Sequence, residues 1–313
     1  MPKFPPIPRL SIVIPIGQDL AAFESTLISV LENRPLASEV IVAHDGQYDD
    51  PFDLCDEVNF VTSHSGGLVD LIAASVSQSR GRFVHVLSDG IRATPGWTDD
   101  AVEKFEHYDA GVVTPVIRSQ QSGRIVAAGW CDRGGRLCGA AAAGRATVAA
   151  GTAPPIGGAY LQASFWRREL IRSACSAFTA DSDSIEASYA VGQMVRRAGW
   201  RCVLADECTL QCDTEKLPWQ TSSLRLSRRL RAIHSHFYGG GWLQSVGGGL
   251  RALIANVVRP SECLASAGQM FAPLSADQVA GEIHQSVVPK YECRDEVIMR
   301  LPSRSRQGLK RVA

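Results

Sequence analysis

Asp89 and Ser88 stand at the end of an apolar run, residues 83–87, and are followed by a glycine. A carboxylate at the end of a buried strand is well placed for chemistry, because ligands of open α/β sheets collect outside the carboxyl ends of the strands. The same pattern recurs where residues 40–43 lead into Asp45 and a second glycine. We therefore predict a polar pocket at one edge of a sheet, with two acids in it.

A third apolar run, residues 11–14, ends in Pro15, Ile16 and Gly17. Three strand ends therefore contribute to the predicted pocket. A carboxylate there would accept hydrogen bonds from hydroxyl or N–H groups of a ligand, or would bind a divalent cation. The alternative is that both acids are turn residues, whose side chains cap the local backbone.

The 313 residues balance 32 basic side chains against 32 acidic ones. A chain without net charge has no overall field that favours nucleic acid, so we expect no nucleic-acid partner and look for local clusters of charge instead. The length is sufficient for one large core, or for one domain and an appendage. An apolar content of 45% is ordinary for a globular protein.

Cysteine usage and the first residues bear on the compartment. The nine cysteines are an odd number without a regular spacing, which favours reduced thiols. The sequence begins MPKFPPIP, which is not the apolar segment of a secretory signal. No stretch contains the roughly 18 uninterrupted apolar residues that a membrane span requires. These observations predict a cytoplasmic protein.

The first 118 residues alternate between two kinds of apolar period, which is typical of an α/β protein with a mostly parallel sheet and helices on both faces. The predicted strands are residues 10–14, 40–43, 58–62, 83–87 and 111–117, followed by 124–128 and 200–204. The predicted helices are residues 20–31, 68–80, 97–105, 164–173 and 184–198.

The pattern suggests four segments. We predict a proline-rich arm at residues 1–9, a main domain at 10–212, a helical appendage at 213–299 and a flexible basic tail at 300–313. Within the main domain, we expect two halves with different ligands, residues 10–118 and residues 119–212. The arginines of the appendage and the tail predict peripheral contact with an anionic membrane, at its inner face, although a solvated helix face explains the same run.

Several segments between residues 10 and 210 resemble family-2 glycosyltransferases of the GT-A fold, a Rossmann-like architecture. The resemblance rests on the order of eight pieces: SIVIP at 11–15, VIVAHDGQYD at 40–49, SRGRFVHVL at 79–87, PGW at 95–97, GVVTP at 111–115, AG at 128–129, GGA at 157–159 and RRAGW at 196–200. It also shows two departures. The D-x-D motif of the family is degenerate, because Ser88 and Gly90 flank the one remaining acid, Asp89. The acids of the family's acceptor motif are displaced, and Glu186 is the nearest carboxylate.

The resemblance implies that residues 10–118 bind the nucleotide and that residues 119–212 bind the acceptor. It also implies roles for particular residues. Asp45 would bind the base or ribose of a nucleotide, and Asp89 would hold a divalent cation, Mn²⁺ or Mg²⁺, on the diphosphate. Glu186 or Asp183 would be the general base, unless these acids complement the helix N-terminus. His234 is a further candidate metal ligand, or a histidine satisfied in the core. The remaining candidates are Pro15, Ile16, Gly17 and Ser88 for the nucleotide, and Gly157 and Gly158 for the acceptor side.

The implied activity is transfer of a sugar from a nucleotide-diphosphate donor to a hydroxyl of a glycan, a lipid-linked acceptor or a cell-envelope polysaccharide, with inversion by direct displacement. One alternative is a protein that keeps the fold as a non-catalytic binder or scaffold. A nucleotidyltransferase is a second alternative, but the glycine-rich basic motif near the first strand is missing. No G-x-G-x-x-G follows that strand, which argues against a Rossmann dehydrogenase.

Overall fold

The structure is a computed structural model that describes residues 7–133, 135–148, 155–178, 183–219, 223–239, 242–255, 257, 263, 266–284 and 287–290. Within these ranges, no helix combines the length and the apolar character that crossing a membrane would take.

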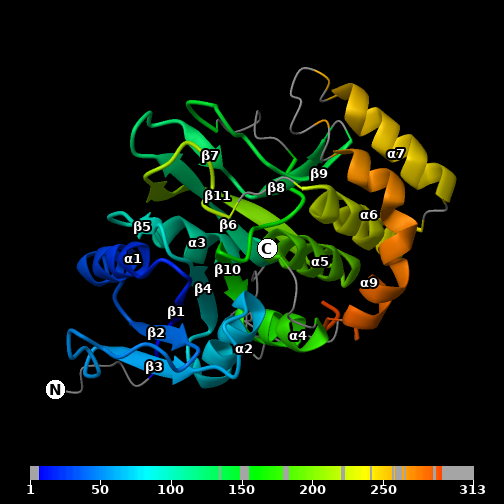
Figure 1. Cartoon of the computed structure of the whole chain (residues 1–313). Coiled ribbons are helices and arrows are strands. Elements are labelled where there is room, and N and C mark those ends of the chain that lie inside the picture. Colours follow the sequence, from blue (N-terminus) through cyan, green and yellow to red (C-terminus); the bar gives the residue numbers. More distant parts are fainter. Residues whose placement is uncertain are drawn as a thin grey trace, which may run out of the picture.

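A mixed sheet of nine strands forms the centre of the molecule (Figure 1), in the order β3-β2-β1-β4-β10-β6-β11-β5, with β7 paired to β6. β8 and β9 form a separate two-stranded sheet. The strands are β1 Leu10–Pro15, β2 Ser38–His44, β3 Val58–Thr62, β4 Phe83–Leu87, β5 Ile91–Ala93, β6 Ala110–Ser119, β7 Ile125–Ala127, β8 Trp130–Arg133, β9 Arg136–Ala140, β10 Ala163–Arg167 and β11 Arg201–Cys212.

The first four strands of the sheet are parallel, and β1 lies between β2 and β4. The chain therefore moves outward from β1 to β3 and then returns to the other side of β1 as β4. β1 and β4 are buried along their whole length, as expected for parallel strands that helices cover on both faces. The point between β1 and β4 is a topological switch point, where ligands of such sheets bind.

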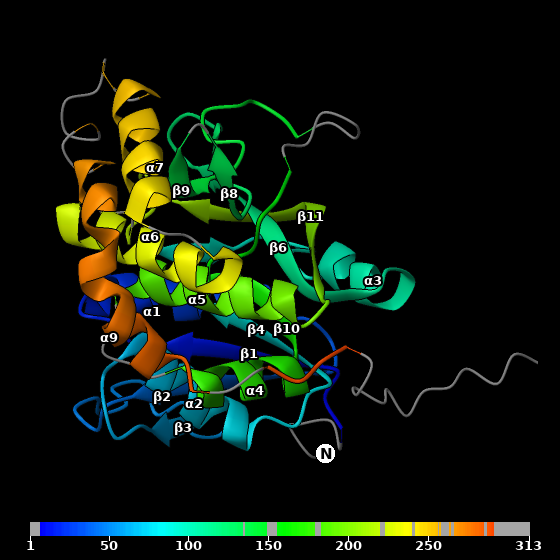
Figure 2. The same cartoon turned by 90° about the vertical axis from the view of Figure 1, so that its right-hand side faces the viewer.

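Helices cover both faces of the sheet (Figures 1 and 2), with α2, α4 and α5 on one face and α1 and α3 on the other. Their bounds are α1 Leu20–Glu32, α2 Leu68–Gln78, α3 Asp99–His107, α4 Arg168–Ala177 and α5 Ser184–Arg197. Asp19 caps α1, because its Oδ1 accepts a hydrogen bond from the Ala22 N–H at 3.1 Å. The predicted fold class, α/β with helices on both faces, is confirmed.

The later helices form a layer beside α5 (Figure 2), consisting of α6 Leu224–Tyr238, α7 Trp242–Ala255, η1 Gly268–Ser275 and α9 Ala276–Glu282. This layer corresponds to the helical appendage. The predicted basic tail at 300–313, and most of the proline-rich arm, lie outside the described residues. The segment boundaries stay predictions.

One predicted element was wrong. Residues 164–173 were expected to form a helix, but Ala163–Arg167 is the central antiparallel strand β10, and α4 begins only at Arg168. A short apolar run does not distinguish a buried strand from the start of a helix. Burial decides here, because all five residues of β10 lie inside the sheet.

His85 lies at the centre of β4 and is fully buried between two aromatic rings. Its ring centroid is 3.7 Å from that of Phe165 and 4.9 Å from that of Trp97. Burial lowers the pKa of His85 to about 3, and an interaction with the backbone of Ser164 offsets only part of this effect. The folded protein therefore keeps this histidine neutral across the range in which a solvated histidine becomes charged.

We expect His85 to make the fold sensitive to acid. The unfolded chain binds a proton at this residue below pH about 6.5, whereas the folded chain does not, so stability present above that pH is lost as the pH falls toward 3. The loss attributable to His85 between pH 6.5 and pH 5 is about 2 kcal/mol. Urea unfolding of the wild type and of His85→Leu at both pH values measures this loss, because the variant should not show the part of the pH dependence that comes from His85. An equal change in the free energy of unfolding in both proteins would contradict the prediction.

Candidate active site

A cavity of about 550 Å³ opens at the switch point between β1 and β4. Six residues predicted from the sequence line it: Pro15, Ile16, Gly17, Ser88, Asp89 and Asp183. They come from the loop after β1, the loop after β4 and the N-terminus of α5. The structure therefore brings together most of the predicted nucleotide site and one of the two predicted catalytic acids.

The loop after β1 lies directly against the carboxylate of Asp89. A Cβ atom on Gly17 would be 2.6 Å from Oδ2 of Asp89 and 2.8 Å from its Oδ1, so a side chain at position 17 would displace the acid. The next residue after Asp89 is Gly90, whose φ of +77° lies in the left-handed region that favours glycine. The two glycines allow the carboxylate to sit at the floor of the cavity.

Asp89 is half-buried, and its surroundings disfavour its charge. Burial raises the pKa of its carboxyl group, the charge of Asp19 adds to this effect, and a hydrogen bond from its own backbone opposes it. A carboxylate that has lost part of its hydration gains from a nearby cation. This environment is consistent with a ligand that brings positive charge into the cavity.

Asp45 lies at the rim of the same cavity rather than in its lining. Its Oδ1 accepts a hydrogen bond from the Gln47 N–H at 3.1 Å. This contact is the one expected if Asp45 is a turn residue that caps the local backbone. Its Oδ2 lies 3.7 Å from the position that a Cβ atom on Gly66 would occupy, and Gly66 lines the cavity. Asp45 therefore stands beside the site and also stabilises its own turn.

Asp183 and Glu186 are one helical turn apart but have different surroundings. Asp183 is the N-cap of α5, with Oδ1 accepting from the Ile185 N–H at 2.9 Å, and it lines the cavity together with Ser184. Glu186 is buried and paired with Arg229 of α6, which also binds Glu282 of α9. Burial raises the pKa of Glu186, and the hydrogen bond from Arg229 opposes the rise. The cavity lining contains Asp183 but not Glu186.

His234 is separate from Asp89. Its Nδ1 lies 2.9 Å from the hydroxyl of Tyr189, which donates to Oδ2 of Asp132 at 3.0 Å. Burial lowers the pKa of His234, and the charge of Arg231 adds to this effect. These contacts match the second prediction for His234, a histidine that hydrogen-bonds within the protein rather than a metal ligand. His234 is also not among the residues that line the cavity.

Gly157 and Gly158 make room for a buried tryptophan. A Cβ atom on either glycine would overlap the ring of Trp130, which is fully buried and donates from Nε1 to the Ala159 carbonyl at 3.0 Å. The backbone that follows leads to Tyr160, Leu161 and the cavity wall. In this structure the two glycines make room for Trp130, and neither lines the cavity; their role on the acceptor side stays a prediction.

Eight residues of the cavity lining were not predicted from the sequence, and two of them carry side-chain N–H groups without a partner among the described residues. Gln162 is almost fully buried; its Oε1 accepts from the Ser188 hydroxyl at 3.1 Å, whereas its Nε2 has no hydrogen-bond partner among the described residues. Nε1 of Trp219, from the segment after β11, also lacks a partner in the described part of the chain. An unpaired buried donor is costly, so both groups are candidates to bind acceptor atoms of a ligand. In the sequence, Gln162 is distinguished only as a single amide side chain within an apolar run.

The cavity also has features that suit a cation held on a diphosphate. No group of three or more His, Cys, Asp or Glu side chains within the described ranges is arranged as a complete metal site. Mg²⁺ and similar ions do not need one, because they are often held by one or two carboxylates together with phosphate oxygens and waters. Asp89, with its raised pKa and its place at the cavity floor, fits that kind of site.

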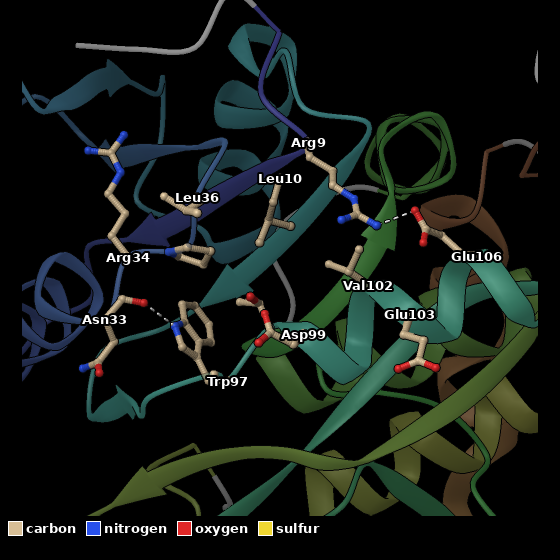
Figure 3. A pocket seen from close by; sticks show the side chains of 13 residues that line it. Arg9, Leu10, Asn33, Arg34, Leu36, Trp97, Asp99, Val102, Glu103 and Glu106 are labelled. Atoms are coloured by element: carbon tan, nitrogen blue, oxygen red, sulfur yellow. Dashed lines mark hydrogen bonds and ion pairs between the residues drawn. The ribbon is translucent and has the colours of Figure 1, made fainter.

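A second cavity, of about 560 Å³, lies at the amino end of β1, away from the first (Figure 3). Three of its polar side chains are engaged with the protein: Arg9 pairs with Glu106, Arg34 donates to the Ser38 carbonyl at 2.9 Å, and Trp97 donates to the Asn33 carbonyl at 3.0 Å. It contains none of the predicted site residues, and we assign it no chemistry.

Comparison with known proteins supports the fold without extending to a family. No protein-family model matches the sequence, and no curated protein matches it. Among solved structures, GalNAc-T7 with UDP, GalNAc and Mn²⁺ matches 88% of this chain at 12% identity with a TM-score of 0.54. The match covers 58% of the GalNAc-T7 chain, so this chain corresponds to little more than half of that protein.

Two other solved structures are similar over most of the chain. The mannosyltransferase PcManGT from Pyrobaculum calidifontis, in complex with GDP-Man and Mn²⁺, matches 88% of this chain and 74% of its own at 13% identity and a TM-score of 0.47. TarS from S. aureus, in complex with UDP-GlcNAc, matches 86% and 92% at 13% identity and a TM-score of 0.47. The likeness to GalNAc-T7 shows the fold, and the predicted GT-A glycosyltransferase fold is confirmed.

Proposed function

We propose that this chain is a glycosyltransferase that moves a sugar from a nucleotide-diphosphate donor to a hydroxyl of a glycan or lipid-linked acceptor. The observation that carries the proposal is the cavity at the switch point of a GT-A fold, which joins the loop after β1, Asp89 and the N-terminus of α5. Nucleotides bind at such switch points because the strand ends leave a crevice there.

The donor would occupy the cavity with its nucleoside toward Asp45 and its diphosphate toward Asp89. Asp45 at the rim would accept a hydrogen bond from the base or ribose. The backbone from Pro15 to Gly17 would face the ribose and diphosphate, where a glycine permits close approach. Nε2 of Gln162 and Nε1 of Trp219 would donate to oxygens of the diphosphate or sugar, which gives these buried groups the partners they lack.

Asp89 would hold a divalent cation, Mn²⁺ or Mg²⁺, between its carboxylate and the diphosphate. Such an ion supplies Lewis-acid stabilisation of the charge that develops on the leaving diphosphate. The N-terminus of α5, at Asp183 and Ser184, directs its positive dipole end toward the same cavity. Ser88 fixes the loop through its backbone N–H, which donates to the Gln162 carbonyl at 2.8 Å.

Asp183 is the residue we propose as general base. Its carboxylate would take the proton of the acceptor hydroxyl while the hydroxyl oxygen attacks the anomeric carbon. The bond from that carbon to the diphosphate oxygen breaks on the opposite side, and its electron pair leaves with the diphosphate. Direct displacement of this kind inverts the anomeric centre. Glu186 does not serve this role in our proposal, because its carboxylate is bound to Arg229 away from the cavity lining.

Release of nucleoside diphosphate from UDP- and GDP-sugars tests this proposal. We expect slow release to water, faster release with an acceptor, and a product of inverted anomeric configuration by NMR. Asp183→Asn should lower the rate by about 10² to 10⁴. Asp206→Asn, which removes a surface acid paired with Lys104, is the matched control and should leave it unchanged. Retained configuration, or full activity of Asp183→Asn, would rule out the assigned mechanism.

A non-catalytic binder is the second candidate function. The observation that favours it is the shortage of acids, since Asp89 has Ser88 and Gly90 beside it and Glu186 is sequestered in an ion pair. A binder would show nucleotide affinity without release of diphosphate from any donor, even with a panel of glycan and lipid-linked acceptors. Turnover with any donor would exclude it.

A further inference from the structure

The outer side of α7 carries an apolar stripe. Four side chains form it, and each is more than half exposed: Leu243, Leu250, Ile254 and, just past the helix end, Val257. Spacings of seven, four and three residues place them on one side of a helix. Figures 1 and 2 both show α7 at the outer edge of the helical layer. Among the residues that the structure describes, this stripe lacks the partner that apolar faces usually have.

The opposite side of α7 packs against the protein. A Cβ atom on Gly248 would be 2.8 Å from the guanidinium carbon of Arg231 in α6, and one on Gly249 would overlap Met270 of η1. Ser245 and Ala252 are buried on this same side. The glycines thus let α6 and η1 approach closely, and this contact fixes which side of α7 faces outward.

η1 carries two further exposed apolar side chains. Phe271 and Leu274 are also more than half exposed, and η1 packs along α7 next to Gly249. We call the six residues together the α7 face: Leu243, Leu250, Ile254, Val257, Phe271 and Leu274. Their exposed fractions lie between 53% and 77%, far above those of the core.

The charges around the α7 face are mostly of one sign. α6, α7 and η1 contain five arginines and no acidic residue. Arg229 is buried against Glu186 and Glu282, but Arg251, beside Leu250, and Arg225, at the start of α6, are exposed. The nearest acids along the chain are Asp277 in α9, three residues past Leu274, and Glu262, five residues past Val257. Because the whole chain has no net charge, this local excess of cations is a distinct feature.

We propose that the α7 face binds the surface of an anionic membrane. α7 would lie parallel to the bilayer, with its stripe at the boundary of headgroups and acyl chains and with Arg251 near the anionic headgroups. A second copy of the chain fits less well. A two-fold contact through this face would bring like-charged helices together, without acids on α6, α7 or η1 to pair with them.

Cosedimentation of the full chain with vesicles tests the proposal. We expect binding to vesicles of phosphatidylcholine mixed with phosphatidylglycerol, and little binding to phosphatidylcholine alone. The double variant Leu250→Gln with Ile254→Gln, and separately Arg251→Glu, should each lower binding at least roughly tenfold. The matched control is Leu36→Gln, because Leu36 is an exposed leucine outside the α7 face and its variant should bind like the wild type.

Two outcomes would overturn the proposal. Anionic vesicles that bind all variants equally would assign the contact to another part of the chain, such as the basic sequence after residue 299. A concentration-dependent dimer in light scattering that the double variant abolishes, without vesicle binding, would assign the α7 face to a second copy. Thermal unfolding confirms that the variants are folded. Nucleotide binding should be unchanged in the variants. The membrane proposal and the proposed transferase function can therefore fail independently, the first in vesicle binding and the second in nucleotide binding.

Discussion

Replacing Asp89 by asparagine should lower the release of nucleoside diphosphate from the donor by about a thousandfold. The variant keeps the shape of the side chain but removes the charge that would hold a cation on the diphosphate. Loss of several kcal/mol of stabilisation in the transition state corresponds to this factor. Asp183 lines the same cavity, but it caps the N-terminus of α5, so we do not expect it to replace Asp89.

The same substitution should not weaken the fold. Burial raises the pKa of Asp89, which means that the folded protein bears a penalty for the charged form at neutral pH. An uncharged asparagine does not bear that penalty, so the melting temperature should equal or exceed that of the wild type. Activity assays and thermal unfolding of Asp89→Asn, beside Asp206→Asn as control, separate the two effects. Unchanged turnover, or loss of both turnover and stability, would contradict the assignment.

Replacing Arg229 by methionine should destabilise the protein by about 3–5 kcal/mol. Arg229 is buried between Glu186 of α5 and Glu282 of α9, and methionine would leave two carboxylates without their cation. Removing one partner of a buried ion pair costs this amount because the remaining charge stays desolvated. The three residues connect α5, α6 and α9, so the helical layer should loosen first.

Urea unfolding measures this effect. Arg9→Met, which breaks the exposed pair between Arg9 and Glu106, is the matched control and should change stability by less than about 1 kcal/mol. A variant at Arg229 as stable as the wild type would show that the ion pairs are not buried in solution.

Glu186→Gln distinguishes the two roles considered for this acid. If Glu186 stabilises the structure, as its contacts indicate, the variant loses stability while its folded fraction keeps turnover within a few fold of wild type. If Glu186 were the general base, turnover would fall by about 10² to 10⁴. The ratio of turnover to folded protein is therefore the informative quantity.

The convergence of Pro15, Gly17 and Asp89 was predictable because it follows from topology. Parallel strands with buried apolar runs bring their carboxyl ends to one edge, so residues after β1 and β4 meet whatever the details of packing. The same logic placed Asp45 in the pocket, whereas the structure has it beside the lining, next to Gly66. These predictions needed the strand order and nothing about side-chain contacts.

The side-chain partners of Glu186 and His234 could not be predicted from the sequence. Helical spacing places Glu186 on one side of α5, but it does not reveal that Arg229, 43 residues later in the sequence, covers that side. His234 likewise meets Tyr189 and Asp132 from two other elements. Gln162 was missed for a related reason, because β10 was predicted as a helix and the residue before it was not seen as part of a strand end.

Thermal unfolding with uridine, guanosine and thymidine diphosphates, each with and without Mn²⁺ or Mg²⁺, tests the central claim most directly. If the cavity between β1 and β4 is a nucleotide site, one of these ligands at a hundred times its dissociation constant should stabilise the protein by about 2.7 kcal/mol. Gly17→Val should abolish that stabilisation, because its side chain would fill the space beside Asp89. No shift with any nucleotide, or an equal shift in Gly17→Val, would contradict the account.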